Sequence, residues 1–434
     1  MAWSRRQFLG GLAGSLASSW WPGRGDAQQA ASAWPGHGVH TSLLSPDRRA
    51  LTWFAPDPTP QLVQVGDLLA DGMAEPHVVL QYASAVQQTY DTDLFTHRAI
   101  LDGADPAQGL LYRIGSGSTW SSWQALRPLG NSNLHFCHFG DHAQSMASRA
   151  VVAGVLGCRP DLAIIAGDLA YANGDQALWD SYFAMLEPLA AVTPVLSCPG
   201  NHERHDGSGQ GYLSRITQPG RGAWYALDLE RVHFFFGTSG CLVDGPASVW
   251  ALVEEVLAME QDLAAAAARR ARGEIDFIIV VQHYPIWTDE DGRDPADFTL
   301  VALEEGMLLR YGVDLLLVGH DHIYERSLPM GRGRPRAGGY VQVTQGGGGQ
   351  SLYDVIPNPA AWSVLATPRW GFSAYEVTGE RIRVTSHAVD DHANRLLPAG
   401  QLQVLDSFEV VARDATARRH FARPPRPREE LLEG

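Results

Sequence analysis

The sequence predicts a layered α/β domain that is preceded by a small all-β sandwich domain. Between residues 40 and 128, short apolar runs alternate with clusters of Pro, Asp and Gly, a pattern that is typical of a β-sandwich. After residue 133, apolar runs of strand length alternate with segments of helical periodicity, which predicts a layered α/β domain. The chain has 434 residues, of which 45% are hydrophobic, so it is long and apolar enough to bury two cores.

The N-terminus carries the pattern of an export signal. Arg5 and Arg6 stand directly before an apolar, Gly-rich stretch that is short for a membrane span. Paired arginines in this place predict a twin-arginine (Tat) signal peptide over residues 1–33. We therefore expect a periplasmic or secreted protein that uses the twin-arginine export machinery and has no stable membrane association after signal cleavage. A basic N-terminus followed by an ordinary apolar segment is the alternative.

Residues 133–413 are predicted to form the α/β domain, and residues 414–434 a disordered tail. Two segments place apolar residues on one helical face: residues 176–190, with Trp179, Phe183, Leu186 and Ala190, and residues 250–272, with Leu252, Val256, Met259 and Leu263. The last segment of the chain is rich in Arg, Pro and Glu and has too few apolar residues for a core.

Five apolar strands of this domain each end in residues that can bind a metal. The strands at 134–139, 162–166, 194–198, 277–282 and 314–318 precede, in this order, Gly140-Asp141, Gly167-Asp168, Gly200-Asn201-His202-Glu203, His283 and Gly319-His320-Asp321-His322. In open α/β sheets, ligands bind beyond the carboxyl ends of the strands. Imidazoles and carboxylates are common metal ligands. We therefore expect the five strand ends to converge on one metal site.

The ordered blocks resemble the motifs of a known enzyme family. Gly-Asp, Gly-Asp-x-x-Tyr, Gly-Asn-His-Glu, Val-x-x-His and Gly-His-x-His-x-Tyr-Glu-Arg together resemble those of the purple acid phosphatases, a branch of the dinuclear metallophosphoesterases. The resemblance implies a calcineurin-like metallophosphoesterase fold, a layered β-sandwich flanked by helices. It also implies that residues 40–128 form the fibronectin-like domain found before many such catalytic domains. We expect a scaffold role for that domain, with an adhesive module as the alternative.

The same resemblance implies a dinuclear metal centre and assigns its ligands. Asp141, Tyr171 and His322 complete the first metal site, Asn201, His283 and His320 complete the second, and Asp168 bridges the two. Family members hold Fe(III) in the first site and Fe, Zn or Mn in the second. The implied reaction is an attack by metal-bound hydroxide without a phosphoenzyme. His202 is the candidate for holding the substrate or protonating the leaving oxygen, unless it only hydrogen-bonds a metal ligand.

The sequence departs from the family pattern at two places. His142 follows Asp141 where the family commonly has Asp-x-Gly, and residues 284–300 contain no histidine where the family usually carries substrate-contacting ones. Arg293 could take over one such contact, because a guanidinium binds two phosphate oxygens. A solvated loop charge beside Asp291 and Asp294 is the alternative for this residue.

Three further groups of residues are expected to have structural roles. Tyr324, Glu325 and Arg326 are expected to orient metal ligands, and the run Gly346-Gly347-Gly348-Gly349 to form a tight turn near the metals. The four cysteines lack zinc-type spacing, so buried thiols are favoured over a disulfide.

The net charge narrows the possible partners. A formal charge of −15 opposes nonspecific binding to nucleic acid or anionic lipid, so a small phosphorylated substrate has to be attracted locally by the metals. The sequence thus predicts an exported, acid phosphatase-like hydrolase that acts on phosphomonoesters. A phosphodiesterase of the same superfamily and a catalytically weak binding protein that keeps the metal fold are the alternatives.

Overall fold

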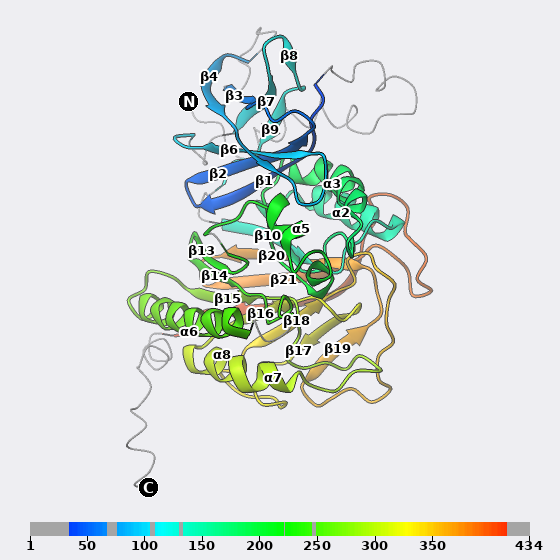
Figure 1. Cartoon of the computed structure of the whole chain (residues 1–434). Helices are drawn as coiled ribbons and strands as arrows, with labels where there is room; N and C mark the ends of the chain where they lie inside the picture. Colours follow the sequence, from blue (N-terminus) through cyan, green and yellow to red (C-terminus); the bar gives the residue numbers. More distant parts are fainter. Residues whose placement is uncertain are drawn as a thin grey trace.

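The computed structural model describes residues 34–66, 76–104, 109–129, 133–220, 222–244 and 249–414. The predicted signal peptide, 1–33, and all but the first residue of the predicted tail, 414–434, lie outside the described residues. Figure 1 shows a small β-rich unit packed on a larger unit of sheets and helices. None of the helices in the described ranges is both long and apolar enough to cross a bilayer.

The N-terminal unit is all-β, as the sequence predicts. One sheet has the order β1-β2-β6-β5, formed by His37–Ser45, Arg48–Ala55, Phe95–Leu101 and Ala85–Gln88. The other has the order β4-β3-β7-β8, with β9 also paired to β7, formed by Val78–Ala83, Leu62–Gly66, Leu110–Ser116, Thr119–Trp120 and Gln124–Leu126. Leu51 and Trp53 of the first sheet share a buried core with Val63 and Ile114 of the second.

The larger unit is built on two mixed sheets that pack face to face. The first has the order β12-β11-β10-β20-β21-β22, formed by Val195–Cys198, Leu162–Ala166, Asn133–Phe139, Gly371–Thr378, Arg381–Ala388 and Gln403–Val411. The second has the order β13-β14-β15-β16-β18-β17-β19, formed by Tyr225–Leu229, Val232–Phe236, Phe277–Val281, Leu315–Val318, Val341–Gln345, Tyr324–Ser327 and Ser363–Thr367. Phe136 and Ile164 from the first sheet and Phe234 and Ile279 from the second lie in one buried core.

Helices cover the outer face of each sheet. On the first sheet lie α2, Met146–Cys158, and α3, Gln176–Ala190; on the second lie α6, Val249–Ala271, and α8, Gly306–Tyr311. The short elements α4, Asn201–Arg204, α5, Gln210–Arg215, α7, Phe298–Leu300, and the π-helical turn η2, Val301–Glu305, lie in the connections. The predicted layered β-sandwich flanked by helices is therefore confirmed.

Local sequence explains where the flanking helices begin and how they pack. Ser145 and Ser148 form a capping box that starts α2, and Asp175 accepts the Ala177 amide to start α3. The predicted apolar face of α3, including Trp179 and Phe183, is buried against the first sheet. An apolar stripe at helical spacing thus fixes which side of each helix meets the sheet.

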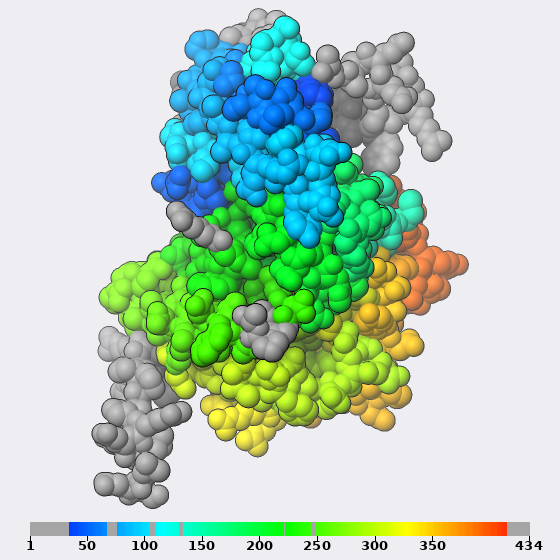
Figure 2. All heavy atoms as spheres, viewed as in Figure 1, coloured from blue at the N-terminus to red at the C-terminus, as the bar shows by residue number. Residues whose placement is uncertain are grey.

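The two units are bound together by direct contacts. Thr41 donates to the Ala190 carbonyl at 2.9 Å and Tyr112 to the Ala191 carbonyl at 2.7 Å, both at the end of α3. Arg98 donates to the Ser214 carbonyl at 2.7 Å. Figure 2 shows the N-terminal unit, in blue, seated on the green part of the larger unit. The N-terminal unit is therefore placed against the segment that follows β12, which carries part of the site described next.

Candidate metal centre

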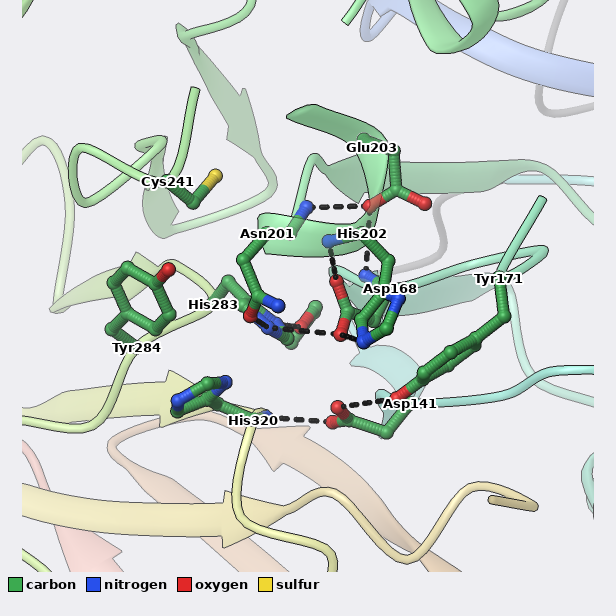
Figure 3. A network of polar contacts seen from close by, with 12 residues as sticks. Asp141, Asp168, Tyr171, Asn201, His202, Glu203, Cys241, His283, Tyr284 and His320 are labelled. Carbon is green, nitrogen blue, oxygen red and sulfur yellow. Dashed lines mark hydrogen bonds and ion pairs between the residues drawn. The ribbon is translucent and has the colours of Figure 1, made fainter. Parts of the chain in front are cut away.

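The residues that the sequence assigns as metal ligands meet at one edge of the two sheets. Each lies in the loop or turn that follows a strand: Asp141 after β10, Asp168 and Tyr171 after β11, Asn201 after β12, His283 after β15, and His320 and His322 after β16. Figure 3 shows six of them around a common space. The loops are also joined by their backbones, since Asp141 donates to the Gly167 carbonyl at 3.1 Å and Gly319 to the His283 carbonyl at 3.0 Å.

Three of these groups form a first cluster. The Tyr171 hydroxyl lies 3.1 Å from Asp141 Oδ1 and 3.0 Å from His322 Nε2, and the two latter atoms lie 3.3 Å apart. His322 is held from its other nitrogen, because Nδ1 contacts the Ser351 carbonyl at 2.6 Å. Its ring also stacks on Tyr353 with the centroids 4.1 Å apart. Because Nδ1 is held by the Ser351 carbonyl, Nε2 is the nitrogen of His322 that can face a metal.

A second cluster is centred on His283. Its Nε2 lies 3.1 Å from Asn201 Oδ1 and 3.4 Å from Asp168 Oδ2. Its Nδ1 contacts the Ala166 carbonyl at 2.8 Å, so Nε2 is the nitrogen that faces the site. The His320 ring stands nearly perpendicular to the His283 ring, with the centroids 5.0 Å apart.

Asp168 stands between the two clusters. Ligand atoms of Asp141, Asp168 and His283 all lie within 4.8 Å of one another, and all three residues are buried. Asp141 belongs to the first cluster and His283 to the second, so a carboxylate at Asp168 is close to both. This is the place of the bridging ligand in the sequence assignment.

Backbone strain marks the same residues. Asp141, Asp168, Tyr171 and His320 have φ angles of 54°, 51°, 51° and 69°. Residues other than glycine occupy this left-handed region infrequently, at a cost of about 1–3 kcal/mol each. The rest of the fold holds the four residues in place, so the turns are shaped to direct these side chains inward rather than to minimise local strain.

Glycines allow the loops to approach each other closely. A Cβ on Gly200 would lie 2.1 Å from Asp168 Oδ1, and one on Gly167, whose φ is 82°, would lie 2.3 Å from His283 Nδ1. The run from Gly346 to Gly349 packs in the same way, because a Cβ on Gly348 would lie 2.0 Å from the Gly140 carbonyl oxygen. The glycine run thus serves as a close-packed support under the Asp141 loop.

Glu203 is a buried residue that fixes two ligand loops, and its role was not assigned from the sequence. Its carboxylate accepts the amides of Gly200 at 2.6 Å, Asp168 at 3.0 Å and Leu169 at 2.9 Å. Figure 3 shows it above Asp168 and Asn201. Burial and the nearby Asp168 carboxylate raise its pKa to about 8. The only sequence signal was its position in the block Gly-Asn-His-Glu.

The donor set fits a pair of cations. Burial lowers the pKa of His283, but the Asp168 carboxylate outweighs it and raises that pKa to about 10. Burial alone would raise the pKa of Asp168, yet His283 and His202 hold it well below its usual value. An imidazole therefore holds a proton beside a buried carboxylate, at a position where a cation would replace the proton. Carboxylate, phenol, amide oxygen and imidazole are together a suitable set for hard or borderline metals.

His202 lies at the mouth of the site. Its side chain is 31% exposed, its Nδ1 contacts Asn173 Oδ1 at 2.7 Å, and its Nε2 is 3.8 Å from Asp168 Oδ2. The ring lies against that of Tyr171, with the centroids 4.2 Å apart. Asn173, which the sequence did not single out, therefore orients His202 so that Nε2 points toward the Asp168 carboxylate.

Arg293 lies beside the histidine pair. Its Nε is 2.6 Å from Asp321 Oδ1 and 3.1 Å from Glu290 Oε2, and its guanidinium carbon is 5.8 Å from the centroid of the Tyr353 ring. Asp321 is fully buried, and in the sequence it stands between the proposed ligands His320 and His322. The arginine is thus ion-paired at the edge of the site and is not a solvated loop charge.

The structure places other expected residues away from the metal ligands. His142 is buried, with Nδ1 3.3 Å from the Tyr182 hydroxyl and Nε2 3.2 Å from the Ser148 carbonyl, so its ring turns toward the helices that cover the first sheet. Tyr324 and Arg326 both bond to Asp406 on β22, so these two side chains join the sheets instead of orienting ligands. Tyr182 is 40 residues from His142, and Asp406 is at least 80 residues from Tyr324 and Arg326, so local spacing does not reveal these contacts.

Comparisons with known proteins agree with this geometry. Residues 134–324 match the family model described as calcineurin-like phosphoesterase. The chain is 26% identical over 401 residues to acid phosphatase type 7 of Danio rerio, covering 83% of this chain and 88% of that protein. It is 23% identical over 375 residues to purple acid phosphatase 18 of Arabidopsis thaliana, covering 81% of each. The purple acid phosphatase from yellow lupin seeds has a similar fold, with a TM-score of 0.71 at 18% identity over 91% of this chain and 78% of that one.

Proposed function

Because this chain is a calcineurin-like metallophosphoesterase related to the purple acid phosphatases, and hence a phosphoric ester hydrolase, we propose that it hydrolyses phosphomonoesters at a dinuclear metal centre. The observation that carries the proposal is the pair of donor clusters, each with contacts of 3.0–3.4 Å, in which Asp168 lies within 4.8 Å of both Asp141 and His283. Two clusters joined by one carboxylate suit two ions that bind one phosphoryl group.

The proposed occupants follow from the donors. Asp141, Tyr171 and His322 would hold Fe(III), because a carboxylate and a phenol favour a hard trivalent ion. Asn201, His283 and His320 would hold Fe, Zn or Mn, and Asp168 would bridge. When bound, the two ions would polarise the phosphoryl oxygens and supply an activated water as nucleophile. The chain itself holds the donors in place through the strained turns and the Glu203 carboxylate.

His202 is proposed to act on the substrate. Its ring is partly exposed above Asp168, and Asn173 fixes the orientation of the imidazole. From this position Nε2 can donate to a phosphoryl oxygen or to the leaving oxygen. A residue that only supports a metal ligand would be expected to be buried, whereas this side chain faces the mouth of the site.

Arg293 is proposed to bind the phosphoryl group from the other side. Its ion pairs with Asp321 and Glu290 hold the guanidinium at the edge of the site, where its remaining N–H groups can reach a phosphate oxygen. A monoester dianion gains more from such a donor than a diester monoanion, which supports the phosphomonoester as substrate.

One observation favours a phosphodiesterase as the second candidate. The segment 284–300 contains no histidine, and the arginine in it already neutralises two carboxylates. A site with few free cationic donors discriminates less strongly against a substrate with a single negative charge.

The export signal remains part of the proposal. We propose that the twin-arginine pattern at Arg5 and Arg6 directs the folded protein to the periplasm or the medium. Export of a folded protein is compatible with metals that are loaded before translocation.

Metal analysis combined with a substrate panel tests these proposals. The purified protein should contain two metal ions per chain and hydrolyse 4-nitrophenyl phosphate faster than bis(4-nitrophenyl) phosphate. The reverse order would establish the phosphodiesterase. Failure of the metal-loaded protein to hydrolyse either ester would leave the binding protein as the remaining function.

A further inference from the structure

A polar hollow opens next to the metal centre. It has a volume of about 620 Å³ and is lined by Arg204, His205, Gly207, Ser208, Val243 and Asp244. None of these residues belongs to the metal ligands or to the proposed phosphoryl contacts. The lining comes from the end of α4 with its following turn, and from the segment after β14.

The hollow and the site are linked by α4. This helix begins at the proposed ligand Asn201, and side chains three and four positions apart in a helix lie on the same side. Arg204 and His205 therefore follow Asn201 along one side, one turn farther along the chain. The rings of His202 and His205 confirm the proximity, since their centroids lie 6.1 Å apart.

A second connection runs through Tyr284. Its ring meets that of the proposed ligand His320 edge-on, with the centroids 4.5 Å apart, as Figure 3 shows. The Tyr284 amide donates to Ser239 Oγ at 3.1 Å, in the segment after β14 that also supplies Val243 and Asp244. The segment that forms one wall of the hollow is thus bonded to the residue that contacts His320.

Arg204 has no carboxylate partner within ion-pair distance among the described residues. Its Nη1 donates to the Val243 carbonyl at 3.3 Å. The acidic residue in the lining, Asp244, accepts from Ser208 at 3.5 Å and has a further interaction. Arg293, by contrast, is ion-paired twice. Arg204 is therefore a cation at the edge of the site whose charge is available to a ligand.

The N-terminal unit supports the turn that forms one wall. A Cβ on Gly207 would lie 2.4 Å from the Tyr90 hydroxyl, so Tyr90, in the connection between β5 and β6, packs directly on this turn. Since the two units are held together by the bonds at the end of α3, the hollow has a fixed wall instead of a free loop.

We propose that this hollow is the subsite for the leaving group, and that Arg204 binds an anionic substituent of that group, either a carboxylate or a second phosphate. The inference rests on the proposed phosphomonoesterase function and adds the class of alcohol that the site prefers. A guanidinium can bind two oxygens of either anion, and the lining of Ser208 and His205 offers further hydrogen bonds. Because the hollow is open to solvent, the preference should weaken as ionic strength rises.

Matched aryl phosphates test the proposal. We expect 3-carboxyphenyl phosphate to be hydrolysed with a kcat/KM about tenfold above that of the uncharged 3-carbamoylphenyl phosphate, which corresponds to about 1.4 kcal/mol. Arg204→Gln should bring this ratio to about one. The exposed Arg383, which pairs with Glu409 on the far strands β21 and β22, provides the control, and Arg383→Gln should keep the wild-type ratio.

Benzene-1,3-diol bisphosphate, with a second phosphate in place of the carboxylate, separates the two anions. For each anion, the kcat/KM ratio to 3-carbamoylphenyl phosphate is measured in the wild type and in Arg204→Gln. The anion whose ratio falls more in Arg204→Gln is the one that the subsite binds. Ratios near one in the wild type, or ratios that Arg204→Gln leaves unchanged for both anions, would overturn the proposal.

A binding measurement keeps the test independent of turnover. The wild-type protein should bind 3-hydroxybenzoate about tenfold more tightly than 3-hydroxybenzamide, and Arg204→Gln should remove the difference, as measured by calorimetry. If no ester is hydrolysed, the proposed function fails. The difference in affinity between the two phenols still shows whether Arg204 binds an anion in the hollow. Equal binding of the two phenols by the wild type would refute it.

Discussion

The carboxylate of Glu203 accepts the backbone amide of Asp168 at 3.0 Å, and both residues are buried. The same carboxylate accepts the amides of Gly200 and Leu169. One side chain on α4 therefore fixes the turn that carries the proposed bridging ligand and the turn that carries Asn201. The separation of these two ligands depends on a contact between loops 35 residues apart in the sequence.

The first prediction tests this positioning role. Glu203→Gln replaces one accepting oxygen with an NH₂ group that cannot accept the Leu169 amide, so the Asp168 turn should shift. We expect metal affinity to fall about 10–100-fold and the free energy of unfolding to fall by about 1–3 kcal/mol. Metal titration and urea unfolding measure the two effects. Glu409→Gln on β22 is the control, and unchanged metal affinity in Glu203→Gln would contradict the role.

The second prediction concerns Tyr171. Its hydroxyl lies within 3.1 Å of Asp141 and His322, so Tyr171→Phe removes one donor from the first cluster without removing the ring. If Fe(III) occupies that cluster, the wild-type protein should show a visible phenolate-to-iron absorption band that Tyr171→Phe lacks, with the circular dichroism spectrum unchanged. A band that persists in the variant would show that another group is the ligand.

The third prediction separates monoesters from diesters at Arg293. Arg293→Ala should raise the KM for 4-nitrophenyl phosphate by a factor equivalent to about 1.5–3 kcal/mol, the range for a charge-assisted contact. The effect on bis(4-nitrophenyl) phosphate should be smaller. Because the change also leaves Asp321 without its ion pair, Arg293→Lys serves as the comparison that keeps the charge but not the two-oxygen grip. Equal, small effects on both esters would place Arg293 outside the substrate contact.

The fourth prediction concerns export. Replacing both Arg5 and Arg6 with Lys should retain the precursor in the cytoplasm, because the twin-arginine route depends on the arginine pair. Fractionation followed by immunoblotting measures the distribution. Secretion of the double variant at the wild-type level would exclude the twin-arginine signal.

The fifth prediction links His233 to stability. Burial lowers the pKa of this imidazole, but hydrogen bonds to Asp228 at 2.9 Å and Asp262 at 2.7 Å outweigh burial and raise the pKa to about 9. Asp228 is also paired with Arg269 at 2.6 Å, so the cluster joins the β13–β14 hairpin to α6.

The pKa of His233 is about 6.5 in the unfolded chain and about 9 in the folded protein. Protonated His233 therefore stabilises the fold fully below pH 6.5, and this stabilisation is lost as the pH rises through 9. Because of this residue, the free energy of unfolding measured in urea should be about 3 kcal/mol larger at pH 6 than at pH 10. His233→Gln should remove most of that difference. A variant that keeps the full wild-type pH dependence would assign it to other groups.

By itself, the sequence determined the five strands that lead to the site, the flanking helices α3 and α6, and the order of residues at the strand ends. These features are local, because the period of apolar residues sets which face of an element is buried, and a turn after a strand presents its side chains at the sheet edge. The all-β character of the N-terminal unit and the relation to the purple acid phosphatases followed from the same local patterns.

Only the tertiary structure decided which partners the polar side chains find. His142 turns toward Tyr182 on α3, Arg293 pairs with Asp321, and Arg204 faces the hollow beside Val243. Each of these contacts joins segments that are separate in the chain, and their meeting depends on strand order and on how the two sheets and the N-terminal unit pack. A charge or hydrogen-bond donor has no preferred partner until packing brings one within reach, so sequence spacing located the donors but could not fix their contacts.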